Sequence, residues 1–370
     1  MTLSRRALGG ALIGAGIVGT GAYVALRDNP LLRGLTGNAT ELRGFVGGEK
    51  QPYLANPQVV DLLRRHGIVL HSTIAGSVEM VRQRSLIDQR PDFLWPSSSV
   101  MTEMAKMSGL SIVRDQTILN TPIVIYSWSG VVEGLVGAGL VTRTADGHYE
   151  VDTGRLIGAI ASRSRWQDVG VPSLYGAIRI SSTDPNRSNS GFMFAGLMLS
   201  ALTGSVPDAG DLDKHFATVR TVFEQMGFKS PSSGKLFDQY IAGGPGSEPM
   251  IVGYENQLVE WAQADRTRWE RIQAGKGARP LLIYPRPTVY SSHPLLALTG
   301  EATALIDALL TPELQAIAWT NHGFRGPLGE QTASAPPGLA ELLIPEVSAT
   351  LPLPGAPVML DLIQRLDAGT

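Results

Sequence analysis

The stretch Ile68-Val-Leu-His-Ser-Thr-Ile-Ala75 predicts a β-strand between two helices. The helix before it is expected to begin at Asn56-Pro57 and to end at Gly67, because Asn is a favoured N-cap and Pro suits the first helical position. The next helix opens directly after Gly76-Ser77. Helix, strand and helix in close succession indicate an α/β protein.

The same alternation of apolar runs and amphipathic stretches continues along the chain. Further strands are expected at Asp92–Trp95, Thr121–Trp128, Ala177–Thr183, Pro249–Glu255 and Pro280–Pro287. Further helices are expected at Ser129–Leu140, Arg155–Trp166, Ser190–Thr203, Asp213–Gly227, Lys235–Ile241, Gln257–Arg268, Glu301–Leu310 and Glu313–Asn321. The proline-rich C-terminal segment, 331–370, is expected to be an extended tail that ends in a short helix near Val358–Leu366.

Composition excludes several classes of protein. The chain has 370 residues, 43% of them hydrophobic, and a formal net charge of −2. This apolar content argues against disorder, and the near-neutral charge argues against a nucleic-acid-binding protein. The absence of cysteine excludes disulfides, Cys-ligated zinc, iron–sulfur clusters and thiol nucleophiles.

Residues 1–30 are expected to form an N-terminal signal or membrane anchor. Arg5 and Arg6 precede the uncharged stretch Ala7–Leu26, which as a helix would span about 30 Å, the thickness of a bilayer core. The arginine pair resembles a twin-arginine leader. The segment is expected to be either an uncleaved membrane anchor or a cleaved leader. Both alternatives place the protein on the periplasmic or extracytoplasmic side of the membrane. Gly14–Gly19 has a G-x-G-x-x-G spacing but follows no strand, so no cofactor site is predicted.

Hydroxyls, glycines and an asparagine gather where strands end and helices begin. In open α/β sheets ligands bind at the carboxyl ends of strands, where helix N-termini offer unpaired N–H groups. The candidate ligand-binding residues are Gly76, Ser77, Ser97, Ser98, Thr183, Asp184, Ser188, Asn189, Ser190, Tyr254 and Glu255.

Each candidate also has a structural alternative. Ser, Thr and Asn are the commonest helix caps, and Asp184-Pro185 is a typical turn start. Glu255 ends an apolar strand, where it would accept hydrogen bonds from a ligand or pair with an arginine. His293 is expected to cap a chain crossover, and Arg325 to anchor the end of the fold.

No catalytic residues or metal ligands are predicted. The chain has no G-x-S-x-G, H-E-x-x-H or G-x-x-x-x-G-K-[ST] motif. Asp184 and Glu255 are the only carboxylates among the candidates, and a pair of this kind could flank a glycosidic bond. Because no other catalytic pattern accompanies them, we expect a binding protein rather than an enzyme.

The chain resembles the type 2 periplasmic solute-binding proteins, from about residue 44 to 326. The matching stretches are Gly47–Lys50, Asn56–Val59, His66–Val69, Ala75–Ser77, Pro96–Ser98, Thr121–Ile123, Ser182–Asp184, Ser188–Ser190, Met250–Glu255, Tyr284–Thr288, Ser292-His293 and His322–Arg325. In Gly47-Gly48-Glu49-Lys50 a glycine stands where the family pattern has serine, and the tail after residue 330 has no counterpart.

The resemblance implies two interleaved α/β lobes joined by a double hinge. Lobe 1 would comprise 40–120 with 288–330, and lobe 2 would comprise 121–287. The chain would cross between them near Asn120-Thr121-Pro122 and near Tyr284-Pro285-Arg286-Pro287, where prolines suit stiff hinge strands.

The resemblance also implies a function. The chain would be an exported, membrane-tethered protein that captures a small polar solute in the cleft between the lobes and passes it to an ABC permease. Hydroxyls and helix N-termini favour an oxyanion or carboxylate ligand, whereas Glu255 in the cleft would favour a ligand with hydrogen-bond donors. The alternative is an envelope sensor or interaction protein that keeps the fold without transport.

Overall fold

The computed structural model describes residues 39–336 and 338–367, and the predicted leader at 1–30 lies outside them. The architecture below is that of the unit Glu41–Thr370. Its strands are β1 (Thr40–Val46), β2 (Ile68–Ile74), β3 (Phe93–Trp95), β4 (Arg114–Trp128), β5 (Val141–Arg143), β6 (Tyr149–Asp152), β7 (Met250–Tyr254), β8 (Pro280–Arg286) and β9 (Tyr290–Ala297).

Most of the remaining regular structure is helical. The helices up to the middle of the chain are η1 (Gly48–Lys50), α3 (Gln51–Ala55), α4 (Pro57–Arg65), α5 (Ser77–Arg82), α6 (Arg84–Ile87), α7 (Val100–Met107), α8 (Ser129–Gly137), α9 (Thr153–Ala161) and η2 (Trp166–Val169). The later helices are α10 (Asn189–Thr203), α11 (Ala209–Gln225), α12 (Ser233–Ser247), α13 (Glu255–Ala264), α14 (Arg266–Gln273), α15 (Thr303–Leu309), α16 (Pro312–His322) and α17 (Ala356–Asp367).

The long strand β4 belongs to two sheets. Its first part, up to Pro122, pairs antiparallel with β9, and from Ile123 onward it pairs antiparallel with β7 and β8. The first sheet has the order β2-β1-β3-β9-β4, and the second continues from β4 through β8 and β6 to β5. β4 therefore passes from one sheet into the other without a break.

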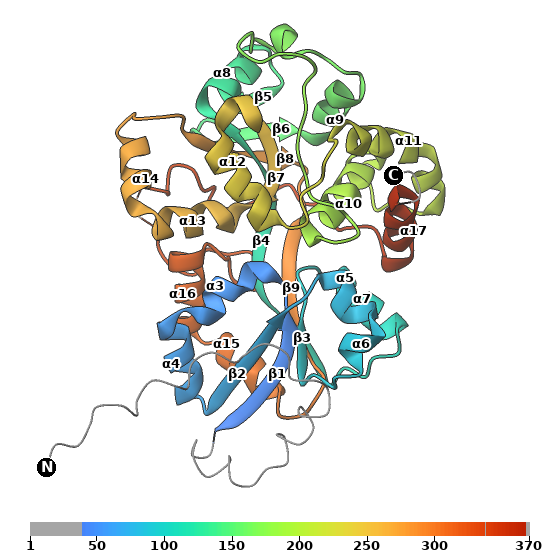
Figure 1. Cartoon of the computed structure of the whole chain (residues 1–370), viewed down its shortest axis with the longest axis vertical. Helices are drawn as coiled ribbons and strands as arrows, with labels where there is room; N and C mark the ends of the chain where they lie inside the picture. The colour runs from blue at the N-terminus through green and yellow to red at the C-terminus, as the bar shows by residue number, and fades with distance from the viewer. Residues whose placement is uncertain (1–38, 337, 368–370) are drawn as a thin grey trace, which may run out of the picture. The chain divides into compact units, whose positions relative to one another are not determined.

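Helices cover each sheet to make two lobes. The first lobe consists of the first sheet with α3–α7, α15 and α16, and the second consists of the second sheet with α8–α14 (Figure 1). In the first lobe, side chains such as Val59, Leu305 and Trp95 form a fully buried cluster between the sheet and its helices. A mixed α/β protein with two lobes is what the sequence predicted.

The chain crosses between the lobes near the expected positions. β4 changes its partner between Pro122 and Ile123, and the segment after Arg286 leads from β8 into β9. At this second crossing, Thr288 Oγ1 donates a hydrogen bond to the carbonyl of Ile123 over 2.7 Å. The residue bounds that the sequence suggested for the lobes remain a prediction.

The C-terminal segment makes a third link between the lobes. The expected short helix is α17, which packs against α10 and α11 of the second lobe and against α7 of the first (Figure 1). The amide of Ala356 donates to Glu103 Oε2 on α7 over 2.9 Å. Met359 and Leu362 are fully buried, so α17 is an integral part of the hydrophobic core.

Three predicted elements differ from the structure, and the first is the helix expected at Arg155–Trp166, which ends at Ala161 as α9. Ala177–Thr183 forms no strand, because its backbone makes only single bridges, such as Ser181 with Ile251, instead of a continuous ladder. The predicted helix Gln257–Arg268 is divided at Asp265, whose backbone leaves the helical conformation and whose side chain caps α14 by accepting from the Arg268 amide over 3.1 Å.

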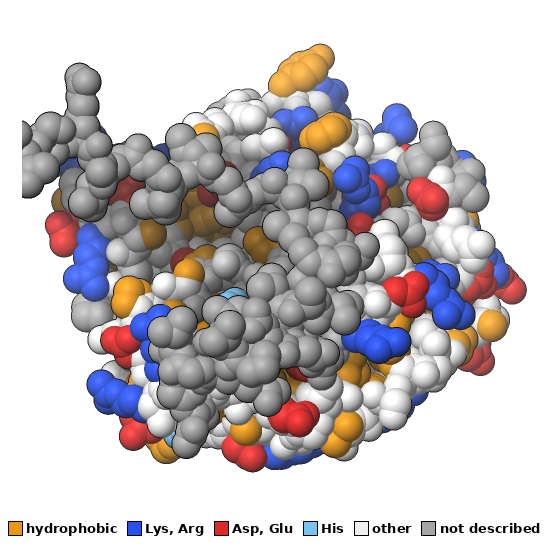
Figure 2. Space-filling view, turned by 60° about the horizontal axis from the view of Figure 1, so that its bottom comes forward, with side chains coloured by type: hydrophobic (Ala, Val, Ile, Leu, Met, Phe, Trp, Pro, Cys, Tyr) orange, Lys and Arg blue, Asp and Glu red, His pale blue; other side chains and the backbone are white. Residues whose placement is uncertain are grey.

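The side chains on one face of the molecule can be compared by their charge. On the visible face, Lys and Arg side chains are interspersed with Asp and Glu (Figure 2), as the formal net charge of −2 suggests. Among residues 39–336 and 338–367, no helix has the length and apolar character needed to cross a bilayer.

Candidate functional site

A cavity of about 570 Å³ lies between the two lobes, and both lobes line it. Its volume is in the range of small-molecule sites, roughly 300–1,000 Å³. The first-lobe wall is made by the ends of β1 and β2 and the helices that follow them, and consists of Gly47, Gly48, Glu49, Pro52, Ile74, Ala75, Gly76 and Ser77. The second-lobe wall consists of Arg187, Ser188, Asn189, Pro231, Ser232, Ser233, Gly234, Phe237, Asp238, Asn256, Gln257, Glu260, Trp261 and Ala264.

Behind the first-lobe wall lies a buried charge cluster, Glu49, Lys50, Ser97 and His293. Lys50 Nζ is 2.6 Å from Glu49 Oε1 and 3.0 Å from both Ser97 Oγ and His293 Nδ1. Lys50 and His293 are fully buried, whereas the Glu49 side chain is 13% exposed and lines the cavity. The cluster therefore holds the Glu49 carboxylate in one position at the wall.

The cluster shifts the pKa of each of its ionisable groups. Burial by itself would raise the pKa of Glu49, but Lys50 and His293 outweigh it, and the pKa of this carboxyl lies well below its usual value. Burial lowers the pKa of Lys50, although the Glu49 carboxylate opposes the shift. Burial and the Lys50 charge lower the pKa of His293 to about 4. At pH 7 a neutral imidazole therefore lies beside the Glu49–Lys50 ion pair.

Asn189 connects the two lobes at the edge of the cavity. It is the first residue of α10, and its Nδ2 donates to the Ser97 carbonyl over 2.9 Å and to the Tyr254 hydroxyl over 3.1 Å. Since a carbonyl can only accept, these contacts fix the orientation of the amide. Its Oδ1 is buried and has no hydrogen-bond partner among the described residues.

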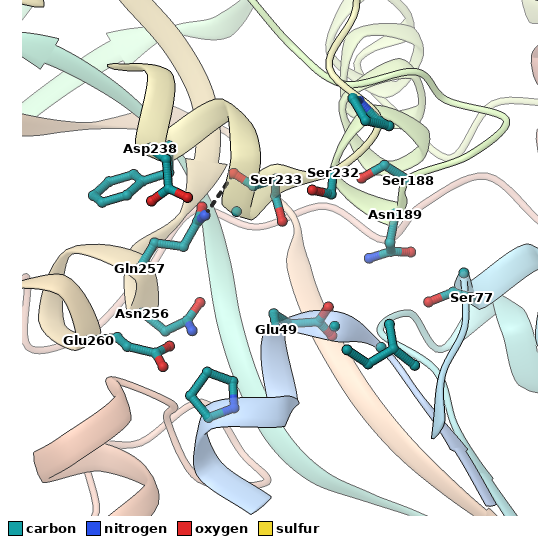
Figure 3. A pocket seen from close by; sticks show the side chains of 18 of the residues that line it. Glu49, Ser77, Ser188, Asn189, Ser232, Ser233, Asp238, Asn256, Gln257 and Glu260 are labelled. Carbon is teal, nitrogen blue, oxygen red and sulfur yellow. Dashed lines mark hydrogen bonds between the residues drawn. The ribbon is translucent and has the colours of Figure 1, made fainter. Parts of the chain in front are cut away.

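Asn256 presents a second unpartnered amide. Its side chain is fully buried, it lines the cavity, and neither Oδ1 nor Nδ2 has a partner in the described part of the chain. Its backbone amide, by contrast, donates to Thr121 Oγ1 over 3.2 Å, which fixes the start of α13 against β4. Figure 3 shows Asn256 on the same side of the cavity as Asp238 and Glu260, across from Ser77, Ser188 and Asn189.

The structure brings four of the predicted site residues to this cavity: Gly76, Ser77, Ser188 and Asn189. Gly76 allows a close approach between the lobes, because a Cβ there would lie 3.3 Å from the Arg187 carbonyl of the second lobe. Ser77 Oγ accepts from the Ser97 amide over 3.0 Å, so it also braces the loop behind the wall.

The other predicted site residues lie outside the cavity lining. Ser97 belongs to the buried cluster, and Ser98 Oγ accepts from the amide of Val100 at the start of α7. Thr183 Oγ1 accepts from the Gly191 amide over 2.7 Å and lies 2.7 Å from Ser190 Oγ, so these two hydroxyls contact each other and the start of α10.

Three further predicted residues have partners within the protein. Asp184 Oδ1 accepts from the Asn186 amide over 2.9 Å, which is the turn geometry expected for Asp-Pro. Tyr254 is fully buried, and burial raises the pKa of its hydroxyl, which accepts from Asn189. Glu255 forms a buried ion pair with Arg325, the structural alternative that the sequence left open.

Several lining residues were not predicted from the sequence. Glu49 and Asn256 each lie in or beside a stretch that the resemblance included, yet neither was chosen as a candidate. Pro231-Ser232-Ser233 has the polar character of a helix start, and Ser232 Oγ does accept from the Lys235 amide at the start of α12 over 3.3 Å. That cap signal could have identified α12 as a further helix that begins at the cavity.

The described residues offer no metal-binding group. No cluster of three or more His, Asp or Glu side chains within 39–336 and 338–367 could hold a metal ion. The cavity instead combines carboxylates, amides and hydroxyls with the aromatic rings of Phe237 and Trp261, which meet edge to face at 6.5 Å between centroids. Such a lining suits a small organic or polar molecule.

Comparison with known proteins finds similar structures but no similar sequence. No protein-family pattern and no curated protein matches this sequence. A periplasmic thiamin binding protein superimposes with a TM-score of 0.59 at 10% identity, covering 89% of this chain and 96% of the other. The periplasmic binding protein AfuA from Actinobacillus pleuropneumoniae, with fructose-6-phosphate bound, gives 0.57 at 13% identity, with 88% and 97% covered.

A third similar structure, a ferric binding protein from Campylobacter jejuni, gives a TM-score of 0.57 at 11% identity and covers 88% of this chain and 97% of that one. The three structures are named for quite different solutes, so the likeness concerns the architecture and not the ligand. It extends over both lobes, because nearly the whole of each of these proteins is covered. The chain therefore has the two-lobed α/β fold of the periplasmic binding proteins, as its sequence resemblance predicted.

Proposed function

We propose that this chain is an extracytoplasmic solute-binding protein that captures a small polar ligand in the interlobe cavity and delivers it to an ABC permease. The observation that carries the proposal is the pair of buried asparagines at the cavity. Asn256 has two unpartnered amide atoms and Asn189 has one, among the residues described. A buried polar atom without a partner costs about 1–3 kcal/mol, and a bound solute would supply the missing hydrogen bonds.

Binding would proceed by closure of the lobes. Asn189 of the second lobe already donates to the Ser97 carbonyl of the first lobe, so the described conformation holds the walls together around the cavity. A ligand that contacts both walls interacts fully only with this closed state. Its affinity therefore depends on the difference between its contacts in the closed and open states.

Binding without catalysis is supported by the positions of the two candidate carboxylates. Asp184 is engaged in a turn and Glu255 in an ion pair, and neither lines the cavity. The pairing of Asp184 and Glu255 across a glycosidic bond is therefore not formed at this site.

Export completes the proposal. The uncharged stretch Ala7–Leu26, preceded by Arg5 and Arg6, would direct the chain across the inner membrane and tether it there, or would be removed after a twin-arginine-type export. In either case the lobes would face the extracytoplasmic side, where an ABC permease takes up solutes.

The test is thermal and chemical unfolding of the full chain with a panel of solutes. A ligand at 100 times its Kd is expected to add about 2.7 kcal/mol to the free energy of unfolding. Asn256→Ala removes both unpartnered atoms, so this variant is expected to lose most of the ligand-dependent stabilisation without losing stability in the absence of ligand. Gln364→Ala, at an exposed position on α17, is the control. An Asn256→Ala variant that responds to ligand as the wild type does would contradict the proposal.

A further inference from the structure

We propose that the interlobe cavity selects a ligand with a cationic nitrogen, such as an organic amine, and not an anion. This inference rests on the proposed function and concerns the chemical class of the solute. It replaces the oxyanion or carboxylate that hydroxyls and helix N-termini suggested from the sequence.

The first observation is the charge of the walls. Three carboxylates line the cavity, Glu49, Asp238 and Glu260, whereas Arg187 is the only basic side chain among the lining residues. Lys50 neutralises Glu49 from behind the wall, and Glu260 Oε1 lies 3.7 Å from His322 Nδ1. The remaining charge is negative at Asp238 and Glu260, which come from neighbouring helices, α12 and α13 (Figure 3).

The second observation concerns the helix N-termini that would otherwise attract an anion. α10, α12 and α13 all begin at the cavity, but acceptors of the protein already hold one first-turn amide of α10, one of α12 and two of α13. In α10, the backbone amide of Gly191 donates to Thr183 Oγ1. In α13, the backbone amide of Asn256 donates to Thr121 Oγ1, and that of Leu258 donates to the Tyr126 hydroxyl. A helix terminus carries only about half a unit charge, so these partly occupied termini are outweighed by full carboxylate charges.

The third observation is the open acceptor of Asn189. Its Nδ2 donates to the Ser97 carbonyl and to the Tyr254 hydroxyl, and it also contacts Met193 Sδ. This leaves Oδ1 buried, unpartnered in the described structure and at the cavity. An ammonium or amine of the ligand would donate to this acceptor, whereas a dehydrated oxyanion would not, and the unpartnered Nδ2 of Asn256 would take an acceptor elsewhere on the same ligand.

The second-lobe wall also suits the hydrocarbon part of an organic cation. Phe237 and Trp261 line the cavity next to Asp238 and Glu260, and aromatic rings attract cations as well as apolar groups. Trp261 already receives a cation on its ring, because the Arg268 guanidinium lies 5.6 Å from the ring centroid. Carboxylate, amide oxygen and aromatic carbon together describe a site for an amine with an apolar body.

The experiment measures binding of chosen probes to the full chain. Putrescine, choline and thiamine serve as cationic probes, sulfate, phosphate and fructose 6-phosphate as anionic probes, and glucose as a neutral probe. Calorimetry is expected to show binding of at least one cationic probe, weakened at least tenfold by Asp238→Asn or Glu260→Gln and further weakened by salt. Glu133→Gln, at an exposed carboxylate on α8 outside the cavity lining, should leave the affinity unchanged.

The outcomes separate the inference from the function on which it rests. Binding of anionic or neutral probes alone would overturn the cationic ligand but keep the solute-binding function. The absence of binding by any probe, with no small molecule released from the natively purified chain and found by mass spectrometry, would contradict both. A released molecule that contains a basic nitrogen would support the inference even when the chosen probes fail.

Discussion

The Glu255 carboxylate and the Arg325 guanidinium form a bidentate ion pair that is completely buried. Arg325 Nε lies 2.7 Å from Glu255 Oε1, and its Nη2 lies 2.8 Å from Oε2. The Tyr284 hydroxyl donates to Oε2 over 2.5 Å. Arg325 also donates to the carbonyls of Ile344 and Pro345, so the pair joins the start of α13, the strand β8 and the C-terminal segment.

Breaking this ion pair should be strongly destabilising. Burial by itself would lower the pKa of Arg325, but Glu255 outweighs it and raises that pKa, so the guanidinium stays charged. In Glu255→Gln this charge would lie buried without a counter-ion, and the free energy of unfolding is expected to fall by about 3–5 kcal/mol. Urea unfolding followed by circular dichroism measures the change.

A double variant separates the charge effect from simple loss of packing. Glu255→Gln combined with Arg325→Met removes both charges, and it should recover a substantial part of the lost stability. The control is the exposed Arg220–Glu224 ion pair. Glu224→Gln should lower the free energy of unfolding by less than about 1 kcal/mol. Equal costs for the buried and the exposed pair would refute the argument.

His293 predicts a specific acid sensitivity. Its pKa is about 4 in the folded protein, against about 6.5 for an unperturbed histidine. Between pH 6.5 and 4 the unfolded chain takes up a proton that the folded chain does not, so the stability falls as the pH falls, by roughly 3 kcal/mol in total. Above pH 6.5 both states are neutral at this residue, and it contributes no pH dependence.

Denaturant unfolding at a series of pH values between 4 and 7.5 tests this prediction. His293→Gln should flatten the loss of stability within that window, whatever its effect on stability at pH 7.5. The lowered pKa of Glu49 adds a further loss only below about pH 4.5, where the unfolded carboxyl becomes protonated. The control is His71→Gln, because the His71 side chain is 51% exposed. An unchanged pH profile in His293→Gln would show that the imidazole is not held neutral by burial.

The sequence predicted strands well where they were uniformly apolar. Pro249–Glu255 and Pro280–Pro287 correspond closely to β7 and β8, whose side chains are almost all buried. β9, Tyr290–Ala297, was not predicted, because Ser291, Ser292 and His293 interrupt its apolar character. Ser291 and His293 are buried, and they contact the Ser97 carbonyl and Lys50 Nζ, a network that no local pattern could show.

The candidate site was predicted only in part for a similar reason. Gly76, Ser77, Ser188 and Asn189 were found because hydroxyls and amides at strand ends mark the cleft of an α/β protein. A hydroxyl that reaches the cavity and one that caps a helix inside the lobe look alike in sequence, and Thr183 is of the second kind. The acidic character of the site depends on Asp238 and Glu260, which lie within helices and come together only in the folded chain.

Two glycines provide a final test of how closely α16 packs against the cavity wall. Gly323 and Gly67 each lie just after the end of a helix. Both have a left-handed backbone conformation, with φ values of 70° and 72°. A Cβ at Gly323 would lie 2.7 Å from Val259 Cβ and 2.8 Å from Asn256 Cα, whereas a Cβ at Gly67 would have no neighbour within 4 Å. Because the backbone strain is nearly the same at the two positions, their difference isolates the packing against α13.

Gly67→Ala should therefore cost only the strain of a left-handed alanine, about 1–2 kcal/mol. Gly323→Ala should cost about 1–3 kcal/mol more, because α13 must move away from α16 to admit the methyl group. The free energy of unfolding in urea, measured for both variants, gives this difference. Equal costs would mean that α13 yields easily at Asn256, and the buried amide that we assign to the ligand would then not be held in a fixed position.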